Sequence, residues 1–127
     1  MGGFELVDDL RETLDDRLRM ALVYEETQYK HIYLDEELRN EYSQSDIERL
    51  RREIIVLALG KNRLTDFTHV GELRRIIYDT DDAMSIQFPL GEHEGVFVSI
   101  DTESEAELFD VIETTQNWID RGCPVSC

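Results

Sequence analysis

The order of structural elements is clearest in residues 73–100, which read LRRIIYD-TDD-AMSIQF-PLGEHEG-VFVSI. This stretch contains three segments rich in β-branched and aromatic residues, at 73–79, 83–88 and 96–100. Within 83–88 the large apolar side chains fall on alternate positions, so one face of that segment is expected to be buried and the other polar: Met84, Ile86 and Phe88 against Ala83, Ser85 and Gln87. Turn-forming residues separate the segments, and the whole stretch predicts a three-stranded antiparallel meander.

Residues before the meander predict a helix followed by a hairpin. Apolar residues recur at helical spacing in residues 4–17, at Phe4, Val7, Leu10 and Leu14. Two β-rich segments follow, at 18–24 and 29–34, and polar Glu25-Glu-Thr-Gln28 lies between them. That pattern is typical of two antiparallel strands joined by a short turn.

A second helix is predicted to begin at Ser45-Asp-Ile-Glu48, which has the spacing of a capping box. Its apolar stripe consists of Ile47, Leu50, Ile54 and Leu57, and Gly60 is the expected C-terminal stop. We expect residues 35–44 to be a surface linker and residues 63–69 to form a separate short turn or helix.

A last helix is predicted from a capping box at Thr102-Glu-Ser-Glu105 to about Asp120. Its apolar face comprises Leu108, Phe109, Ile112, Trp118 and Ile119. The element order is therefore α-β-β-α-β-β-β-α, an α/β (α+β) fold with one five-stranded antiparallel sheet. The first and last helices would share one face, and the middle helix would lie on the other face or at an edge. We expect one domain at 1–121 and a flexible tail at 122–127.

The charge balance is strongly acidic. The 127 residues include 29 acidic and 13 basic residues, for a formal net charge of −16, and only two of the basic residues are lysines. At low salt such a surface repels itself, whereas at molar salt the screening length falls to about 3 Å. This composition indicates a protein of a salt-in halophile; an acidic mesophilic protein that favours arginine is the alternative.

The same charge argues against nucleic acid as a partner, because phosphate binding needs clustered cations. The one basic cluster, Arg49, Arg51 and Arg52, is interspersed with Glu48 and Glu53. No apolar run approaches the ~20 residues needed to cross a bilayer. The N-terminal residues lack the basic and apolar regions of a secretion signal, so a cytoplasmic location is expected.

No catalytic or cofactor motif stands out in the sequence. The glycines form neither a dinucleotide-binding nor a P-loop pattern. Three histidines, His31, His69 and His93, are candidates for acid-base chemistry. We expect His31 to be packed or partly solvated in its strand, and His69 has no neighbour in sequence that would orient it. His93 lies between Glu92 and Glu94, but neighbours in a tight turn point in different directions. Cys123 and Cys127 could form a small loop or bind metal, yet further ligands are missing. We therefore predict no enzyme activity, no cofactor and no metal.

Two resemblances add to this interpretation. The segments Phe4-Glu-Leu-Val-Asp-Asp-Leu-Arg11 and Phe88-Pro-Leu-Gly91, with the composition, resemble small uncharacterised haloarchaeal proteins, which implies no activity. The element order, most visibly from Gly71-Glu-Leu-Arg-Arg-Ile-Ile-Tyr-Asp-Thr-Asp-Asp82 to the last helix, resembles the roadblock/longin (profilin-like) modules.

The roadblock resemblance implies a small, non-catalytic and usually dimeric module that scaffolds or regulates small GTPases and related partners. In that family the middle helix and the first strand of the C-terminal meander build the dimer. By position, the resemblance implies an interface of Leu50, Ile54, Leu57, Arg75, Ile76 and Ile77. A homodimer that docks a cytoplasmic protein is the leading hypothesis.

Two other functions stay open at this point. Profilin-like sheets often hold ligands on the sheet face not covered by the paired helices, and Tyr24, Tyr29 and Tyr33 would then line the pocket of a small-molecule sensor. An enzyme would need a site assembled from distant acidic residues and a histidine.

Overall fold

The predicted element order and sheet are confirmed by a computed structural model, which describes residues 4–122. The sheet is five-stranded and antiparallel, with strand order β2-β1-β5-β4-β3. The strands are β1 (Leu18–Tyr24), β2 (Tyr29–Leu34), β3 (Ile76–Asp79), β4 (Ala83–Pro89) and β5 (Gly95–Asp101). The helices are α1 (Glu5–Leu14), α2 (Glu36–Glu41), α3 (Gln44–Thr68) and α4 (Leu108–Arg121), with two short 3₁₀ helices, η1 (Asp15–Arg17) and η2 (Thr102–Glu107).

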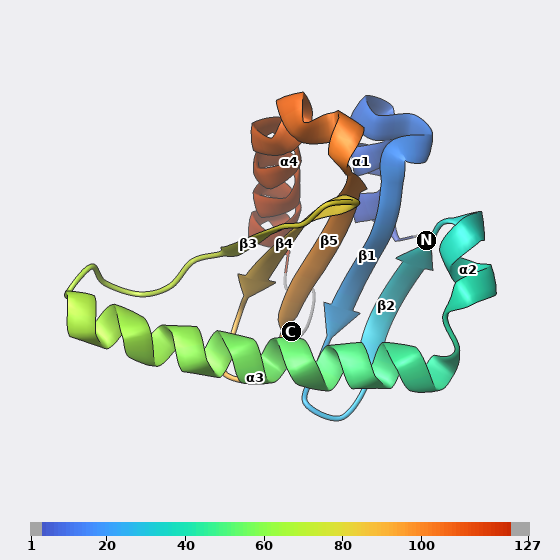
Figure 1. Cartoon of the computed structure of the whole chain (residues 1–127). Coiled ribbons are helices and arrows are strands. Elements are labelled where there is room, and N and C mark those ends of the chain that lie inside the picture. The colour runs from blue at the N-terminus through green and yellow to red at the C-terminus, as the bar shows by residue number, and fades with distance from the viewer. Residues whose placement is uncertain (1–3, 123–127) are drawn as a thin grey trace.

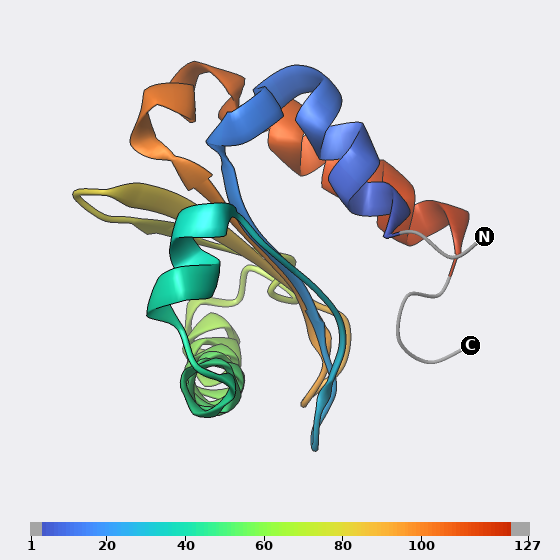
Figure 2. The same cartoon turned by 90° about the vertical axis from the view of Figure 1, so that its right-hand side faces the viewer.

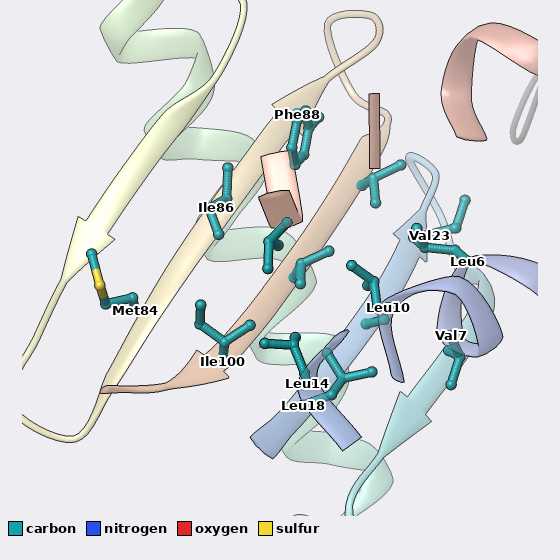
Figure 3. Packing of buried hydrophobic residues seen from close by; sticks show 14 residues of the cluster. Leu6, Val7, Leu10, Leu14, Leu18, Val23, Met84, Ile86, Phe88 and Ile100 are labelled. Carbon is teal, nitrogen blue, oxygen red and sulfur yellow. The ribbon is translucent and has the colours of Figure 1, made fainter. Parts of the chain in front are cut away.

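The sheet lies between two layers of helices. Helices α1 and α4 cover one face, and α2 and α3 lie against the other (Figure 2). The side of α1 and α4 holds one apolar core that includes Leu6, Leu10 and Leu14 of α1 and Val23, Ile86 and Ile100 of the sheet (Figure 3). Burial of these leucines and isoleucines contributes about 1.5–3 kcal/mol each.

The opposite face of the sheet is also covered, which corrects the expectation of a polar face on the middle strand. Gln87 of β4 is fully buried beneath α3. The apolar residues of this second core come mainly from β1, α3 and β5: Met20, Leu22, Tyr24, Leu38, Ile47, Ile54, Ile55 and Phe97. Because helices cover both faces of the sheet, a polar residue that alternates with apolar ones along the strand, such as Gln87, is buried rather than exposed to solvent.

Two expectations about the segment from 35 to 48 are wrong. Residues 36–41 form a helix rather than a linker, because the Asp35 carboxylate accepts a hydrogen bond from the Leu38 amide at 2.9 Å and Leu38 is buried. Helix α3 begins after Ser43, not at Ser45. The Ser43 hydroxyl accepts from the Asp46 amide at 3.2 Å, and the Asp46 carboxylate accepts from the Ser43 amide at 3.0 Å.

Helix α3 also continues past Gly60, which corrects the expected stop. The helix ends eight residues later at Thr68, where His69 adopts the left-handed conformation (φ 57°) that commonly closes a helix. A glycine inside a helix costs about 1 kcal/mol relative to alanine, which the good helix formers around it offset. The short helix expected at 63–69 is therefore the last part of one 25-residue helix.

The limits of β3 and α4 differ from the prediction for local reasons. Strand β3 begins at Ile76 rather than Leu73, because residues 70–75 run back from the far end of α3 to the sheet (Figure 1). Asp101, not Thr102, caps the segment after β5, and its carboxylate accepts from the Glu103 amide at 3.0 Å. The first turns form η2, and regular helix α4 starts at Leu108.

Gly95 tests the packing at the start of β5. A Cβ atom there would lie 2.5 Å from the Tyr24 hydroxyl oxygen and 2.5 Å from the Phe88 carbonyl oxygen. We expect Gly95→Ala to lower the free energy of unfolding by about 1–3 kcal/mol, measured by urea denaturation. In the control Gly122→Ala, the Cβ meets no described atom within 4 Å, and the change should stay within about 0.5 kcal/mol. Equal effects of the two variants would contradict this account.

Candidate protein-interaction surface

Helix α3 is longer than the sheet it packs against. Its 25 residues span about 37 Å at 1.5 Å per residue. Five strands spaced by about 4.8 Å are only roughly 19 Å wide. The helix runs across the strands, and its C-terminal end extends beyond β3 (Figure 1). All buried residues of α3 lie between Ile47 and Ala58, so the described part of this chain leaves residues 59–68 without a full cover.

The solvent side of α3 carries large apolar residues. Four of them, which we call the α3 stripe, are exposed: Val56, Leu57, Leu64 and Phe67. At 100° per residue they fall within an arc of roughly 100° on the side opposite the buried Arg51. Phe67 is 80% exposed. A contiguous apolar surface of this kind marks an interaction site more often than isolated exposed residues do.

The open edge of the sheet lies next to this helix. Strand β3 is the last strand in the sheet, so one side of its backbone has no strand partner within residues 4–122. Ile77, which pairs with Ile86, is 46% exposed on the face covered elsewhere by α1 and α4. An unpaired strand edge with an exposed apolar residue is a surface onto which another strand can add.

The region from α3 to β3 also differs from the rest of the chain in its net charge. Residues 44–79, from α3 to β3, contain six acidic and seven basic residues, for a net charge of +1. The other 91 residues contain 23 acidic and six basic residues, for a net charge of −17. A negatively charged molecule, including a second copy of this chain, is therefore repelled least where α3 and β3 lie.

Arg51 fixes the N-terminal half of α3 to the sheet. Its side chain is buried, and its guanidinium donates to the Glu48 carboxylate at 2.7 and 3.0 Å. It also donates to the backbone carbonyls of Glu25, at 3.1 Å, and Glu26 in the β1–β2 turn. A buried arginine needs such complete pairing, and these contacts fix where α3 crosses the sheet.

Gln87 fixes the middle of α3 through a buried polar network. Its amide nitrogen donates to the Ile54 carbonyl at 2.9 Å and to the Tyr24 hydroxyl at 2.8 Å. Its amide oxygen accepts from the Tyr78 hydroxyl at 2.6 Å, which ties β3 to the same network. Both polar atoms of the amide are satisfied, so the network holds the helix and the edge strand in one arrangement.

Burial changes the acidity of the two tyrosines. Desolvation raises the pKa of Tyr24 to about 12; its hydrogen bond with Gln87 lowers the pKa, and the nearby Tyr78 raises it. Desolvation also raises the pKa of Tyr78. Both phenols stay neutral at physiological pH, as a buried hydrogen-bond network requires.

The six interface residues implied by the roadblock resemblance divide into two groups. Leu57 and Ile77 are exposed and are available to a partner. Ile54 and Ile76 are buried in this chain, Leu50 is half-buried, and Arg75 places its guanidinium 5.9 Å from the centre of the Phe88 ring. Sequence reasoning missed Val56, Leu64 and Phe67, although their helical spacing forms a second apolar stripe, on the side of the helix opposite Arg51.

The candidate residues for chemistry do not converge. His31 stacks on Phe4 with ring centres 5.0 Å apart, and His93 lies 3.8 Å from Glu26 between two exposed turns. His69 ends α3 beside a hollow of about 400 Å³ lined by Asn62, Thr65, Asp66, Gly71 and Glu72. Across residues 4–122, no three histidine, cysteine or carboxylate side chains are arranged to hold a metal ion. Cys123 and Cys127, and the predicted tail apart from Gly122, lie outside the described residues.

The three tyrosines proposed to line a sensor pocket do not share one. Tyr24 and Tyr29 are a cross-strand pair on the α3 side of the sheet. Tyr33 lies on the other face, where it packs against the core under α1 and α4. In addition, none of the described helices has the length and apolar character needed to span a membrane.

Residues 4–120 match a protein family described as Domain of unknown function (DUF7522). The chain belongs to this family. No curated protein matches it significantly.

Solved structures of other proteins share the fold of this DUF7522 member. A structure of MglB with a tetrameric arrangement aligns over 92% of this chain and 86% of its own, with a TM-score of 0.65 and 16% identity. The gliding protein MglB from Thermus thermophilus has the same TM-score and identity, over 92% and 87% of the two chains. A Roadblock/LC7 domain from Streptomyces avermitilis aligns over 94% and 98%, with a TM-score of 0.56 and 13% identity. The fold is therefore roadblock-like.

Deprotonation of Tyr24 tests the buried network. Because the folded state favours the neutral phenol, this contribution to stability is complete below the ordinary tyrosine pKa of about 10 and is lost as the pH rises toward 12. We expect the free energy of unfolding to fall over that interval by about 2–3 kcal/mol more in the wild type than in Tyr24→Phe, measured by urea denaturation at each pH. Identical pH profiles for the wild type and Tyr24→Phe would contradict the role of the network.

Proposed function

We propose that this chain is a non-enzymatic, roadblock-like regulatory module that acts as a homodimer and docks a cytoplasmic protein partner. The observation that carries the proposal is the part of α3 that extends beyond the sheet (residues 59–68, which we call the overhang), together with the exposed α3 stripe and the open edge of β3 beside it. No part of residues 4–122 covers these two features, so a second chain is the natural cover.

A second copy of this chain is the proposed cover, because a two-fold axis beside β3 would bring both the open strand edges and the α3 overhangs of the two copies together. Antiparallel pairing of two β3 strands would continue the sheet from one copy into the other. Both α3 helices would then lie on the same face of the joined sheet, and each overhang would extend over the other copy. The near-neutral charge of residues 44–79 lets two chains of net charge −16 meet there.

The type of partner is proposed from the fold. Roadblock modules as a class scaffold or regulate small GTPases, and the likeness to MglB and to a Roadblock/LC7 domain supports the same role for this chain. At 16% and 13% identity the likeness concerns the fold, so a small GTPase is the partner to test first.

Affinity co-purification from a lysate of the source cells, held in molar KCl, should recover a small GTPase. Recovery of the tagged protein alone would count against this partner.

Phe67 tests the homodimer directly. We expect Phe67→Glu to place a charge in the apolar contact and convert the dimer to a monomer, with at least a tenfold rise in the dimer dissociation constant. The matched control is Phe109→Glu on α4, because Phe109 is 79% exposed against 80% for Phe67 and lies outside the α3–β3 region. Light scattering over a concentration series in molar KCl measures both. A monomeric wild type, or equal weakening by both variants, would contradict the proposal.

The acidic composition supports a second proposal, that the protein is adapted to high salt. Residues outside 44–79 carry a net charge of −17, and their mutual repulsion is screened only at high ionic strength. We expect cooperative structure to be lost progressively below roughly molar KCl, as measured by circular dichroism during thermal unfolding. A fully cooperative transition at the same temperature in dilute buffer would contradict the adaptation.

A further inference from the structure

The helix layer formed by α1 and α4 ends before the sheet does. Ile77, Ile86 and Val98 form one row across β3, β4 and β5 on the face that this layer covers. Ile86 and Val98 are 0% exposed, whereas Ile77 is 46% exposed. Helix α4 lies on the β4 side of α1, so it is the last helix before the edge strand (Figure 1). The face of β3 beside α4 is therefore uncovered within residues 4–122.

The side of α4 that faces away from α1 carries an exposed aromatic residue. The opposite side is identified by two contacts: the Trp118 ring lies 5.7 Å from the Phe4 ring, and Arg121 pairs with Asp9 of α1 at 2.9 Å. Phe109 precedes Trp118 by nine residues, which make about 2.5 turns of helix. Phe109 thus projects from the flank opposite Trp118, and it is 79% exposed.

The proposed homodimer turns these two features into a trough. Antiparallel pairing of two β3 strands about a two-fold axis keeps both α4 helices on the same face of the joined sheet. Because each helix layer ends at β4, the two α4 axes would stand three to four strand spacings apart, roughly 14–19 Å. One further helix between them needs two helix contacts of 8–10 Å, roughly 16–20 Å in all. The gap, which we call the α4 trough, therefore has room for one helix and not for two.

The charges around the α4 trough define what kind of helix fits. On the floor, Arg75 and Asp79 lie two positions before and after the uncovered isoleucine of β3, and their charges cancel. On the walls, Glu113 and Asp120 are exposed and lie within about 40° of Phe109 around the helix axis. A neutral, apolar floor between two acidic walls is complementary to a helix with one apolar side and basic residues on both flanks.

We propose that the α4 trough binds one amphipathic, basic helix of the partner protein. An amphipathic helix that lays its apolar side in a groove is a common mode of recognition. The trough lies on the two-fold axis, so one bound helix excludes a second and each homodimer takes one partner. This inference rests on the proposed homodimer, and it adds the partner's docking element and the stoichiometry of the complex.

A synthetic peptide tests the chemistry of the trough without the natural partner. The probe is an amphipathic helical peptide of about 18 residues, about 27 Å long, with a row of leucines flanked by lysines. The comparison peptide carries glutamates in place of the lysines. Fluorescence anisotropy with the full chain in molar KCl, at concentrations where it is dimeric, measures both affinities. We expect one lysine peptide per dimer, bound at least threefold more tightly than the glutamate peptide.

Three variants locate the binding site. Phe109→Ala should raise the dissociation constant of the lysine peptide at least tenfold while the dissociation constant of the dimer stays unchanged. Glu113→Lys combined with Asp120→Lys should make the protein prefer the glutamate peptide. The charge-matched control is Asp8→Lys combined with Glu12→Lys on the exposed side of α1, which should keep the wild-type preference.

The outcomes separate the trough from the homodimer. A dimeric wild type that binds neither peptide, binds both equally or takes two peptides per dimer would overturn the trough while the homodimer stands. Unchanged affinity for the lysine peptide in Phe109→Ala would do the same. A wild type that stays monomeric at every concentration would overturn the homodimer, and the trough with it.

Discussion

The rest of the structure depends on the mismatch between a helix of about 37 Å and a sheet of roughly 19 Å. A five-stranded sheet covers only about half of α3, and the helix crosses it with its C-terminal end past the edge strand (Figure 1). The overhang forces the chain to return through residues 70–75 before β3 begins. It also leaves an apolar stripe and an open strand edge side by side, so the same constraint shapes the fold and creates the surface.

The two buried polar contacts beneath α3 have distinct effects. Arg51 ties the helix to the β1–β2 turn, whereas Gln87 ties its middle to β1 and β3 through Tyr24 and Tyr78. Apolar packing alone tolerates small shifts of a helix along a sheet, but a satisfied buried hydrogen-bond network specifies one arrangement. The overhang therefore has a fixed length and direction, as a surface that recognises a partner must have.

Much of the fold was predictable because periodicity reports local burial. Alternation in residues 73–100 and helical spacing in residues 4–17 were sufficient for the element order. The extent of α3 was not predictable from Gly60, because the local cost of a glycine is smaller than the gain from continuing the helix. The candidate surface was only partly predictable: apolar residues at helical spacing predict burial without saying which chain buries them. Val56, Leu64 and Phe67 therefore resemble core residues until the structure shows that they lie on the solvent side of α3, away from the sheet.

Hydrogen–deuterium exchange of the wild-type protein tests most directly whether a second copy covers this surface. Peptides spanning the C-terminal part of α3 and β3 (residues 59–79) should exchange slowly at high protein concentration in molar KCl and faster on dilution, while β1 and β5 show no such change. That result would mean that another chain protects the overhang and the strand edge. Fast exchange of residues 59–79 at every concentration would contradict the account.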